Sequence, residues 1–580
     1  MGSMGMLALV VVLLLCLRCT PSPSSASVTA PHTGLKWKVP AHMLLREDEM
    51  QTFEAVSSHG RDDLDLSSSS LQGPSTLRIL WRSLYLLLLF LPVVLTALLA
   101  YLSQVFCRGV WFALLTHSMA GGGAAFIKWG QWASTRPDLF PEDLCVALSH
   151  LHSNAPKHSF AFTRNQIRKE FGDSIEDIFD QFSSQPVASG SIAQVYKAVL
   201  NGQRVAVKVR HPGVEEQIQI DFVIMKAIAA FLEGLPGMSW LNLSESLTQF
   251  SHTIAAQTDL SVEGKHLFLF NKHFKRWMTV DFPRPLVLSE SVLVESWEEG
   301  TTVSEYTDLY NSVKVSSRSF KEYISRLFSS PDPVEKERIS PELAFFVVSK
   351  GVEVYLKMLL ADNLMHADLH PGNIFLRQYD PHGRLVSPEE HRSIKDSRGL
   401  RNQIVLLDAG MVARLIDQEQ ENFIGLLQSM GRGRGDEAAH YILRFSSRKD
   451  YDDTQKAEFI RDMVALFKTS CRGYHYNVNI GQVLQGILQL VRVHRITIEA
   501  NYATLVMNAL CLDSLAGNLI PSYNILDGAK HLLVFHRSLR RFLGLRFFRR
   551  LVPLATTIKS IEDSFFYWRV KRLSSDYRNR

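Results

Sequence analysis

The sequence predicts an α+β fold of two lobes, in which a small sheet-rich lobe precedes a larger helical one. Residues 192–196 and 204–210 alternate as strands do, and the pair Asn201-Gly202 between them is typical of a tight hairpin turn. From about residue 340 helical patterns dominate, and the apolar run 404–407 interrupts them as a short buried strand. This order of segments predicts the two lobes.

The composition is that of a globular protein. The chain has 580 residues, of which 46% are hydrophobic, so it can bury a large core. The net charge of +5 is small for this length, and we therefore expect no nucleic-acid partner. The six cysteines are scattered without the spacing of a zinc site, which favours free thiols in a reducing compartment.

Two segments at the N-terminus are predicted to lie outside the lobes. Residues 1–30 form an apolar targeting segment, whose core Met6–Leu17 is too short to span a bilayer. No Lys or Arg precedes this core and it is not Arg-rich, so a signal peptide, a presequence and a second anchor all stay open. Residues 31–80 are predicted to form a low-complexity linker.

Residues 84–102 predict one transmembrane helix. They form a run of 19 residues without a charge, which at about 1.5 Å per residue nearly matches a hydrocarbon core of about 30 Å. Pro92 would kink the helix, as membrane-spanning helices tolerate. The flanking arginines are too evenly placed to orient it. The alternative is a buried helix or hairpin in a soluble domain.

A polar loop in the second half of the chain has the spacing that phosphoryl transfer needs. His366, Asp368 and Asn373 read His-x-Asp-x-x-x-x-Asn between two hydrophobic runs. Such a loop supplies a carboxylate for the acceptor and, five residues later, an amide ligand for magnesium. We predict a catalytic role for Asp368 and a metal-binding role for Asn373.

A second carboxylate follows the predicted strand. Asp408 ends the apolar run and precedes Ala409-Gly410. An Asp at the end of a buried strand, followed by a flexible Gly, can hold magnesium against the phosphates of a nucleotide. Asp408 is therefore the second predicted metal ligand, and ATP and Mg²⁺ are the predicted cofactors.

The predicted hairpin carries a lysine and a loop suited to phosphates. In a kinase small lobe, a lysine placed as Lys208 is reaches the α- and β-phosphates and pairs with a helix Glu, for which Glu263 is the natural candidate. Small residues in the preceding loop let the backbone approach a nucleotide, although only one is glycine. The predicted nucleotide-binding loop consists of Val187, Ala188, Ser189, Gly190, Ser191, Ile192, Ala193, Gln194 and Val195.

Over about residues 110–530 the chain resembles the UbiB family of atypical kinases, also called AarF-domain-containing kinases. Lys128–Gln131 is similar to the K-x-G-Q motif of the family, and residues 188–194 to its alanine-rich loop. His366–Asn373 is similar to its catalytic loop, and Asp408–Gly410 stands in place of D-F-G. The resemblance implies a bilobal protein-kinase-like fold with an N-terminal helical extension over the site.

The resemblance also implies boundaries and roles. It implies an extension at 110–180, a small lobe at 181–300, a large lobe at 301–535 and a basic C-terminal tail at 536–580. In the family the K-x-G-Q segment occupies the region where a peptide would bind, which disfavours a protein substrate. The residues that the resemblance assigns to regulation are Lys128, Gly130, Gln131, Gln257 and Asp259.

Three positions depart from the family pattern. The E-x-D motif reads Gln257-Thr-Asp259, and a neutral Gln cannot form the ion pair with Lys128 that Glu would form. Gly190 occupies a position that is usually Ala, and Ala409 replaces the aromatic residue of D-F-G. These changes bear on the level of activity and on how firmly the extension is held.

Three functions remain open from the sequence. The first is a membrane-anchored atypical kinase or ATPase in lipid or quinone metabolism. The second is a pseudokinase scaffold that binds nucleotide or lipid without phosphoryl transfer. The third is a small-molecule kinase of the aminoglycoside or choline type, against which Lys128–Gln131 argues. The family resemblance implies a single-pass protein of a mitochondrial membrane, with a membrane lipid or quinone-like molecule and coenzyme Q biosynthetic proteins as partners.

Overall fold

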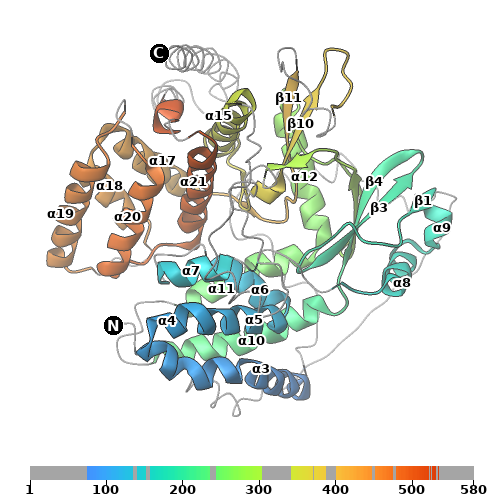
Figure 1. Cartoon of the computed structure of the whole chain (residues 1–580), viewed down its shortest axis with the longest axis horizontal. Coiled ribbons are helices and arrows are strands. Elements are labelled where there is room, and N and C mark those ends of the chain that lie inside the picture. The colour runs from blue at the N-terminus through green and yellow to red at the C-terminus, as the bar shows by residue number, and fades with distance from the viewer. Residues whose placement is uncertain are drawn as a thin grey trace, which may run out of the picture.

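The computed structural model describes most of the chain between residues 75 and 533. The described residues are 75–134, 140–149, 151, 157–234, 243–303, 341–369, 371–386, 400–446, 451–474, 478–520, 523, 525–530 and 533. The predicted targeting segment 1–30, most of the predicted linker 31–80 and the predicted basic tail 536–580 lie outside them. The described part comprises a sheet lobe, a helical lobe and a base of helices beneath both (Figure 1).

The small lobe is built on a six-stranded sheet of order β1-β3-β4-β7-β6, with β2 paired to β3. At the turn between β3 and β4, Asn201 and Gly202 have φ of 51° and 74°, the left-handed values that a type I′ turn requires. The predicted hairpin is therefore confirmed. The strands are β1 Gln181–Phe182, β2 Ala188–Ser189, β3 Ala193–Leu200, β4 Gln203–Arg210, β6 Pro285–Leu288 and β7 Val292–Ser296.

One face of this sheet carries the core of the small lobe. Val205, Val207 and Val209 of β4 are completely buried on that face. They pack with helices α8 (Phe160–Phe171) and α9 (Ile175–Ile178). Because successive strand residues point to opposite faces, Lys208 lies on the other face, away from this core.

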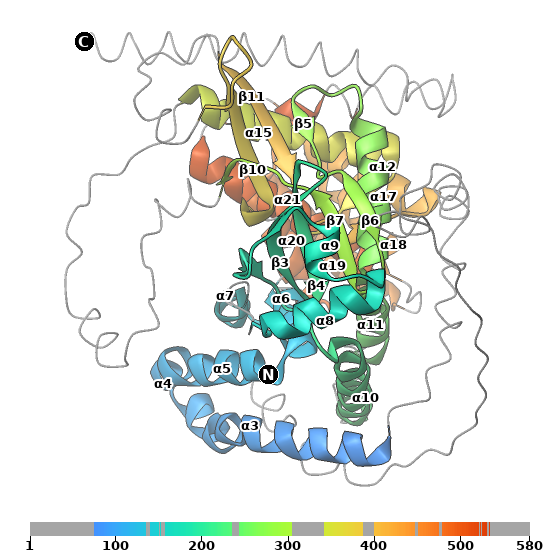
Figure 2. The same cartoon turned by 90° about the vertical axis from the view of Figure 1, so that its right-hand side faces the viewer.

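Seven helices and one π-helical turn form the base of the molecule (Figure 2). They are α3 Thr76–Leu102, α4 Gln104–Phe106, η4 Cys107–Trp111, α5 Phe112–Gly122, α6 Ala124–Ser134, α7 Glu142–Ser149, α10 Val214–Glu233 and α11 Leu243–Thr258. One apolar cluster unites α3, α5, α6 and α10 through Leu86, Met119, Ala133 and Ile220. Within the described part, α3 is the helix that is long and apolar enough to cross a membrane.

Helix α12 (Leu260–Phe274) leads from the small lobe into the strands of the large lobe. A four-stranded sheet has the order β5-β11-β10-β8, and β9 pairs with β12. These pairings bring the segments around residues 366 and 408 side by side. The strands are β5 Val280–Asp281, β8 Thr301–Thr302, β9 Met365–His366, β10 Ile374–Tyr379, β11 Arg401–Leu406 and β12 Val412–Ala413.

The remainder of the large lobe is helical. Its core includes the stacked rings of Phe445 and Tyr502, whose centroids lie 3.8 Å apart. A sheet lobe followed by a helical lobe is thus confirmed, whereas the transmembrane helix at 84–102 stays a prediction. The helices are α15 Pro341–Lys357, η7 Met358–Asp362, η8 Pro371–Asn373, α17 Asp417–Arg432, α18 Gly435–Arg444, α19 Asp453–Ser470, α20 Ile480–Val493 and α21 Ala500–Leu519.

Gly264 sets how closely α12 approaches the small-lobe sheet. A Cβ at this position would lie 2.1 Å from Leu288 Cδ2 of β6 and 3.1 Å from Leu293 Cδ1 of β7. We expect Gly264→Ala to lower the free energy of unfolding by about 1–3 kcal/mol, because the leucines must move. Thermal melting with denaturant titration measures the change.

Gly517→Ala is the matched control, because Gly517 also lies in a helix but has no atom within 4 Å of its added Cβ. This substitution should raise stability by roughly 0.5–1 kcal/mol. A Gly264→Ala protein that melts no lower than the wild type would contradict the close approach of α12.

Candidate functional site

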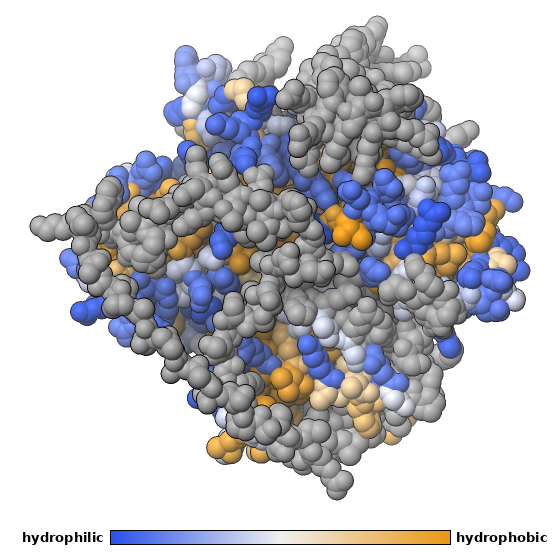
Figure 3. Space-filling model, turned by 180° about the vertical axis from the view of Figure 1, so that it is seen from behind, coloured by the Kyte–Doolittle hydropathy of each residue, from blue (hydrophilic) through white to orange (hydrophobic). Residues whose placement is uncertain are grey.

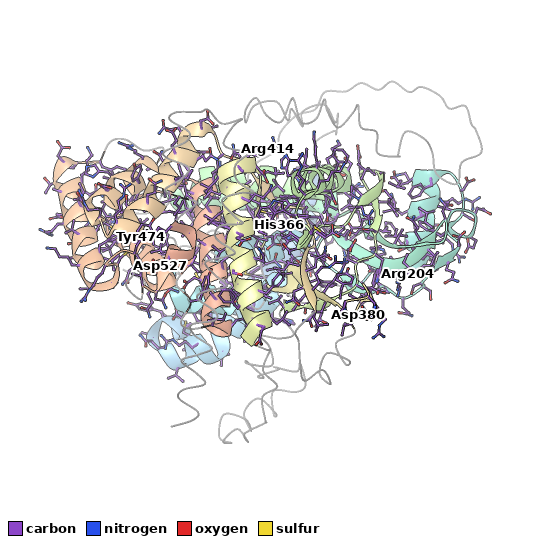
Figure 4. The ribbon with its side chains drawn as sticks, turned by 90° about the horizontal axis from the view of Figure 1, so that it is seen from above. Arg204, His366, Asp380, Arg414, Tyr474 and Asp527 are labelled. Carbon is purple, nitrogen blue, oxygen red and sulfur yellow. The ribbon has the colours of Figure 1, made fainter. Side chains whose placement is uncertain are left out.

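The two predicted polar segments meet in the middle of the molecule. Figure 4 shows His366 between Arg204 of the small lobe and Tyr474 and Asp527 of the large lobe. In β9 and β12, His366 pairs with Val412, and the backbone N–H of Ala367 donates to the carbonyl of Met411 at 2.9 Å. The loop that carries Asp368 is thereby fixed beside the loop that carries Asp408.

The buried side chain of His366 connects these two loops by hydrogen bonds. Its Nδ1 accepts from the backbone N–H of Asp368 at 3.2 Å, and its Nε2 lies 3.0 Å from the carbonyl oxygen of Leu407. Because a carbonyl only accepts and a backbone N–H only donates, the ring carries its proton on Nε2. On the other side, Nδ2 of Asn508 in α21 donates to the carbonyl of His366 at 2.8 Å.

Asp368 and Asn373 form one unit. Nδ2 of Asn373 donates to the backbone carbonyl of Asp368 at 3.0 Å and lies 3.5 Å from Oδ2 of its carboxylate. The backbone N–H of Leu407 donates to the carbonyl of Asn373 at 2.9 Å. With Nδ2 so engaged, the oxygen Oδ1 is the part of the Asn373 side chain that suits a cation.

Asp408 has an unusual backbone and a stabilised negative charge. Its φ of 53° lies in the left-handed region, where non-glycine residues are uncommon and often functional. Burial by itself would raise the pKa of Asp408, but Lys208, Lys128 and the backbone N–H of Gly410 outweigh it, so the pKa is lowered. The carboxylate is therefore ionised at neutral pH.

Lys208 lies between two buried glutamates. Its Nζ is 2.5 Å from Oε1 of Glu263 in α12 and 3.2 Å from Oε1 of Glu295 in β7. β7 pairs with β4 so that Lys208 is opposite Leu293, which places Glu295 diagonally on the same face of the sheet. The predicted pairing of Lys208 with Glu263 is present, and Glu295 is an additional partner.

The charges in this cluster do not balance. Burial would lower the pKa of Lys208, but Glu263, Glu295 and Asp408 raise it, and the lysine stays charged. Burial raises the pKa of Glu263 to about 7 and raises that of Glu295, although Lys208 opposes both shifts. The directions agree physically, since the ammonium of Lys208 faces three carboxylates, and the charge of Asp408 raises the pKa of both Glu263 and Glu295. Oε2 of Glu295 is buried without a hydrogen-bond partner.

Helix α12 joins this cluster to the Asp408 loop. Asp259 caps the helix by accepting from the backbone N–H of Ser261 at 2.9 Å, and Glu263 follows one turn later. One turn further, Nδ1 of His266 lies 3.1 Å from the carbonyl oxygen of Ala409. Burial lowers the pKa of His266 to about 4, so the neutral ring donates this bond. The Asp259 of the Gln257-Thr-Asp259 motif thus has a capping role.

The Lys128–Gln131 motif lies in α6, against the site. The charge of Lys128 acts on Asp408 and lowers its pKa. A Cβ on Gly130 would lie 2.3 Å from Leu151 Cδ1, so only glycine fits there without movement. Nε2 of Gln131 donates to the carbonyl of Leu151 at 3.2 Å. Gly130 and Gln131 therefore fix the packing of α6, while Lys128 faces the acidic cluster.

Gln257 has no such contact with Lys128. Its side chain is 8% exposed, and Nε2 has no hydrogen-bond partner. Among the described residues, no hydrogen bond joins Gln257 to Lys128. The neutral residue in the E-x-D position thus offers Lys128 no carboxylate at 257, and the charge of Lys128 lowers the pKa of Asp408.

A family comparison agrees with this geometry. The ABC1 atypical kinase-like domain matches residues 150–439. A protein of Dictyostelium discoideum named probable serine/threonine-protein kinase abkC is 32% identical over 498 residues, which cover 77% of this chain and 68% of that protein. The chain belongs to the ABC1 family of atypical kinases.

Other relatives carry the names of the predicted family. A mitochondrial ABC1 family protein of Schizosaccharomyces pombe is 28% identical, over 78% of this chain and 70% of that protein. A probable protein kinase UbiB of Tolumonas auensis is 26% identical, over 73% of this chain and 69% of that protein. The resemblance to the UbiB family is confirmed.

The loop that covers the phosphates in kinases is here β2, the turn after it and the start of β3. Val187, Ala188 and Gly190 are exposed, and a Cβ on Gly190 would meet only the Ala193 carbonyl at 3.5 Å, so alanine would fit. Nε2 of His211 lies 2.9 Å from the carbonyl oxygen of Gly190 and fixes the turn from behind.

The side chain of Gln194 points away from this ABC1 site. It is completely buried, its Oε1 accepts from the backbone N–H of His158 at 3.0 Å, and its Nε2 donates to the hydroxyl of Tyr196 at 2.5 Å. Ile192 is also buried. Of the predicted loop residues, these two therefore pack in the interior, and their side chains do not face the nucleotide site.

The oxygen atoms present fit magnesium held together with phosphates. Among the described residues, no group of three or more His, Cys, Asp or Glu side chains could hold a metal ion by itself. Magnesium usually binds through one or two protein oxygens and the substrate phosphates. The ionised Asp408 and Oδ1 of Asn373 supply that number.

Three contributors to the site were not predicted from the sequence: Glu295, His266 and Asn508. Glu295 follows the apolar run Val292–Val294, and only the register with β4 directs its side chain to Lys208. His266 and Asn508 each bind a loop residue that lies more than 140 positions away in the sequence. The sequence signal that could have found Glu295 is a charged residue directly after the apolar run Val292–Val294 of a strand.

Glu295 should make stability depend on pH. Because the folded-state pKa of Glu295 is raised, its ionisation opposes folding, and stability falls as the pH rises above the ordinary glutamate pKa of 4.5. At pH 8, Glu295→Gln should therefore raise the free energy of unfolding by on the order of 1 kcal/mol relative to the wild type, which thermal melting detects as a higher melting temperature. At pH 5 the substitution should change the melting temperature little.

The matched control is Glu299→Gln, on the same segment. Glu299 pairs with Arg204 at the surface, with 39% of its side chain exposed. This substitution should leave the difference in melting temperature between pH 5 and pH 8 the same as in the wild type. A Glu295→Gln protein that is destabilised equally at both pH values would refute the excess of negative charge around Lys208.

Proposed function

We propose that the chain is a membrane-anchored atypical kinase or ATPase that binds Mg-ATP and supports mitochondrial lipid or coenzyme Q metabolism. The observation that carries the proposal is the convergence of Lys208, Asp368, Asn373 and Asp408. Hydrogen bonds join Asp368 to Asn373 and Asn373 to Leu407, next to Asp408, and the charge of Lys208 acts on Asp408. These residues come from three segments, β4, the loop 366–373 and the loop after β11, and a solvated surface would not hold them in this way.

Each group has a part in phosphoryl transfer. Lys208, directed by Glu263, would bind phosphate oxygens, and its fixed ammonium needs no reorganisation as charge develops. Asp368 would accept the proton of the attacking hydroxyl or water. Asn373 and Asp408 would hold magnesium, which supplies neutralisation of the phosphate charge.

The position of α6 favours a small acceptor over a peptide. Lys128 acts on Asp408 from a helix that belongs to the base of the molecule. A peptide substrate would need open space on this side of the catalytic loop. A membrane lipid or a quinone-like molecule, with coenzyme Q biosynthetic proteins as partners, is the acceptor environment that we propose.

The proposed location rests on the relatives and on α3. Two relatives in yeasts are named as mitochondrial. Helix α3 has the length and composition to interact with a membrane. Together these support a mitochondrial membrane as the place of action.

A pseudokinase scaffold is the second candidate. It is favoured by Gln257, whose buried Nε2 has no partner, and by Ala409 in place of an aromatic residue. Such a protein would bind nucleotide with Lys208 and Asp408 and would not turn it over. Binding and turnover are therefore tested separately.

For binding, we expect Mg-ATP to raise the melting temperature of the wild type and to raise that of Asp408→Asn much less. Asn tolerates the left-handed backbone of residue 408, so this variant removes the charge and keeps the fold. The measurement is a thermal-shift titration with and without EDTA. Equal stabilisation of both proteins would exclude Asp408 as a metal ligand.

For turnover, we expect Asp368→Asn to reduce ATP hydrolysis or transfer by about 10²–10⁴-fold, the usual contribution of a general base. ATPase activity is measured with and without anionic liposomes, on variants that still show the thermal shift. Wild-type protein that binds Mg-ATP but has no turnover in either condition would support the scaffold instead.

A further inference from the structure

Helix α3 is attached to the other helices of the base by a buried ion pair. Arg82 of α3 binds Asp221 of α10 through two hydrogen bonds, Nε to Oδ1 at 2.7 Å and Nη2 to Oδ2 at 2.9 Å. The Asp221 side chain is completely buried. A two-pronged contact of this kind is among the strongest that side chains make, and breaking it would leave a buried carboxylate unpaired.

Polar side chains of the base also bind the backbone of α3. The indole Nε1 of Trp111 donates to the carbonyl of Val93 at 2.9 Å. The hydroxyl of Ser118 donates to the carbonyl of Leu89 at 3.0 Å. Further along, Ala97 and Ala100 are buried in the contact. The helix is thus held along one side over most of its length.

The opposite side of α3 is exposed and apolar. Leu88, Leu95, Leu98 and Leu102 are 58–71% exposed. Between residues 84 and 102 no exposed side chain carries a charge. Figure 3 shows apolar side chains gathered at the lower end of the molecule, the end at which α3 lies in Figures 1 and 2. Val105, which is 85% exposed, continues this outer face beyond the end of α3.

This arrangement is incompatible with a helix that crosses a bilayer alone. If α3 crossed with its contacts intact, the helices that share its apolar cluster, α5, α6 and α10, would have to enter the hydrocarbon beside it. Of these helices, α6 carries Lys128 and α10 carries Asp221, and charged groups at the centre of a bilayer are very costly. If α3 crossed without these contacts, Trp111 and Ser118 would lose their acceptors in the run, and Asp221 would be left buried and unpaired. Either way the contacts of α3 with the rest of the base oppose crossing.

We infer that α3 lies in the plane of a lipid bilayer, with its outer face in the acyl chains and both of its ends on the same side of the membrane. The inference deepens the proposed membrane function and rests on it. The helix then binds the two lobes to the membrane surface, whereas composition alone predicts that it spans the membrane.

The chemistry of the outer face favours lipid over a second copy of the chain. Ordinary protein interfaces are only a little more than half apolar, whereas the exposed positions from 84 to 102 have no charged side chain. Trp81 and Tyr101 lie near the two ends, where aromatic side chains reach the headgroup region. Arg78 and Arg108 flank the apolar stretch. Each pairs with a carboxylate, Glu216 or Asp143, and still has 64% of its side chain exposed toward anionic headgroups.

The test places a cysteine at each end of α3, Ser75→Cys and Ser103→Cys, in the full chain. Both serines are exposed caps of the helix. Cys16, Cys19 and Cys107 are replaced by serine. Cys145 and Cys471 are buried, and burial raises the pKa of Cys511 to about 11, so these three thiols react slowly. The protein is reconstituted in sealed vesicles of phosphatidylcholine and cardiolipin and labelled with a membrane-impermeant maleimide.

Intact mass then counts labels on each molecule. A helix in the plane gives molecules with two labels or none, whichever leaflet they occupy, and the inference expects this result. A spanning helix gives one label on each molecule and would overturn it. Labelling after detergent addition must give two labels throughout. Protein that does not float with the vesicles would overturn the inference and the membrane part of the proposed function, while the Mg-ATP experiments would still decide the kinase part.

A second measurement does not depend on the cysteines. Leu95→Asp places a charge on the outer face and should reduce flotation with the same vesicles by more than tenfold. Val493→Asp is the matched control, because Val493 is a similarly exposed apolar residue (65%) on α20 of the large lobe. Equal flotation of wild type and both variants would show that α3 does not enter the bilayer.

Discussion

The buried cluster around Lys208 is the constraint on which the rest of the site depends. One ammonium faces three carboxylates, from α12, from β7 and from the loop after β11. Buried charges are costly unless they are paired and held in place, so the elements that carry them must be fixed firmly. The Asp259 cap, the close approach at Gly264 and the bond from His266 to Ala409 fix α12. The distance between the lobes follows from these contacts.

Local patterns in the sequence were sufficient for the hairpin, the catalytic loop and Asp408, because the chemistry of each is contained in a few consecutive residues. Lys208 and Glu263 were also predictable, since a kinase lysine requires a helix carboxylate. Glu295 was not, because a charged residue in an apolar strand can face either side until its partner strand is known. The role of Asn508 could not be predicted from the sequence for a related reason. Its contact with His366 depends on how α21 packs, and no local pattern encodes that packing.

The same limit explains the uncertainty about α3. Composition gives the hydrophobicity of a helix and its length, and both match a bilayer. It does not tell which side of the helix is covered by protein. The covered side is set by residues outside the run, among them Trp111 and Ser118, which bind its backbone, and Asp221, 139 positions after Arg82. The contacts that a helix makes with its neighbours, which its own composition does not encode, therefore bear on whether it lies on a membrane or crosses it.

Other helices of the base are also packed against the helix that carries Lys128 of the site. Leu86 of α3, Met119 of α5 and Ala133 of α6 belong to one apolar cluster. A Cβ on Gly130 would approach Met119 Cε to 3.0 Å, so α6 has little freedom to move against α5. Among the described residues no hydrogen bond joins Gln257 to Lys128, and the packing of α6 helps to fix this lysine where its charge acts on Asp408. The helix that faces the lipid and the lysine that faces the nucleotide site are thus linked by rigid contacts, and tightly packed interiors transmit displacement.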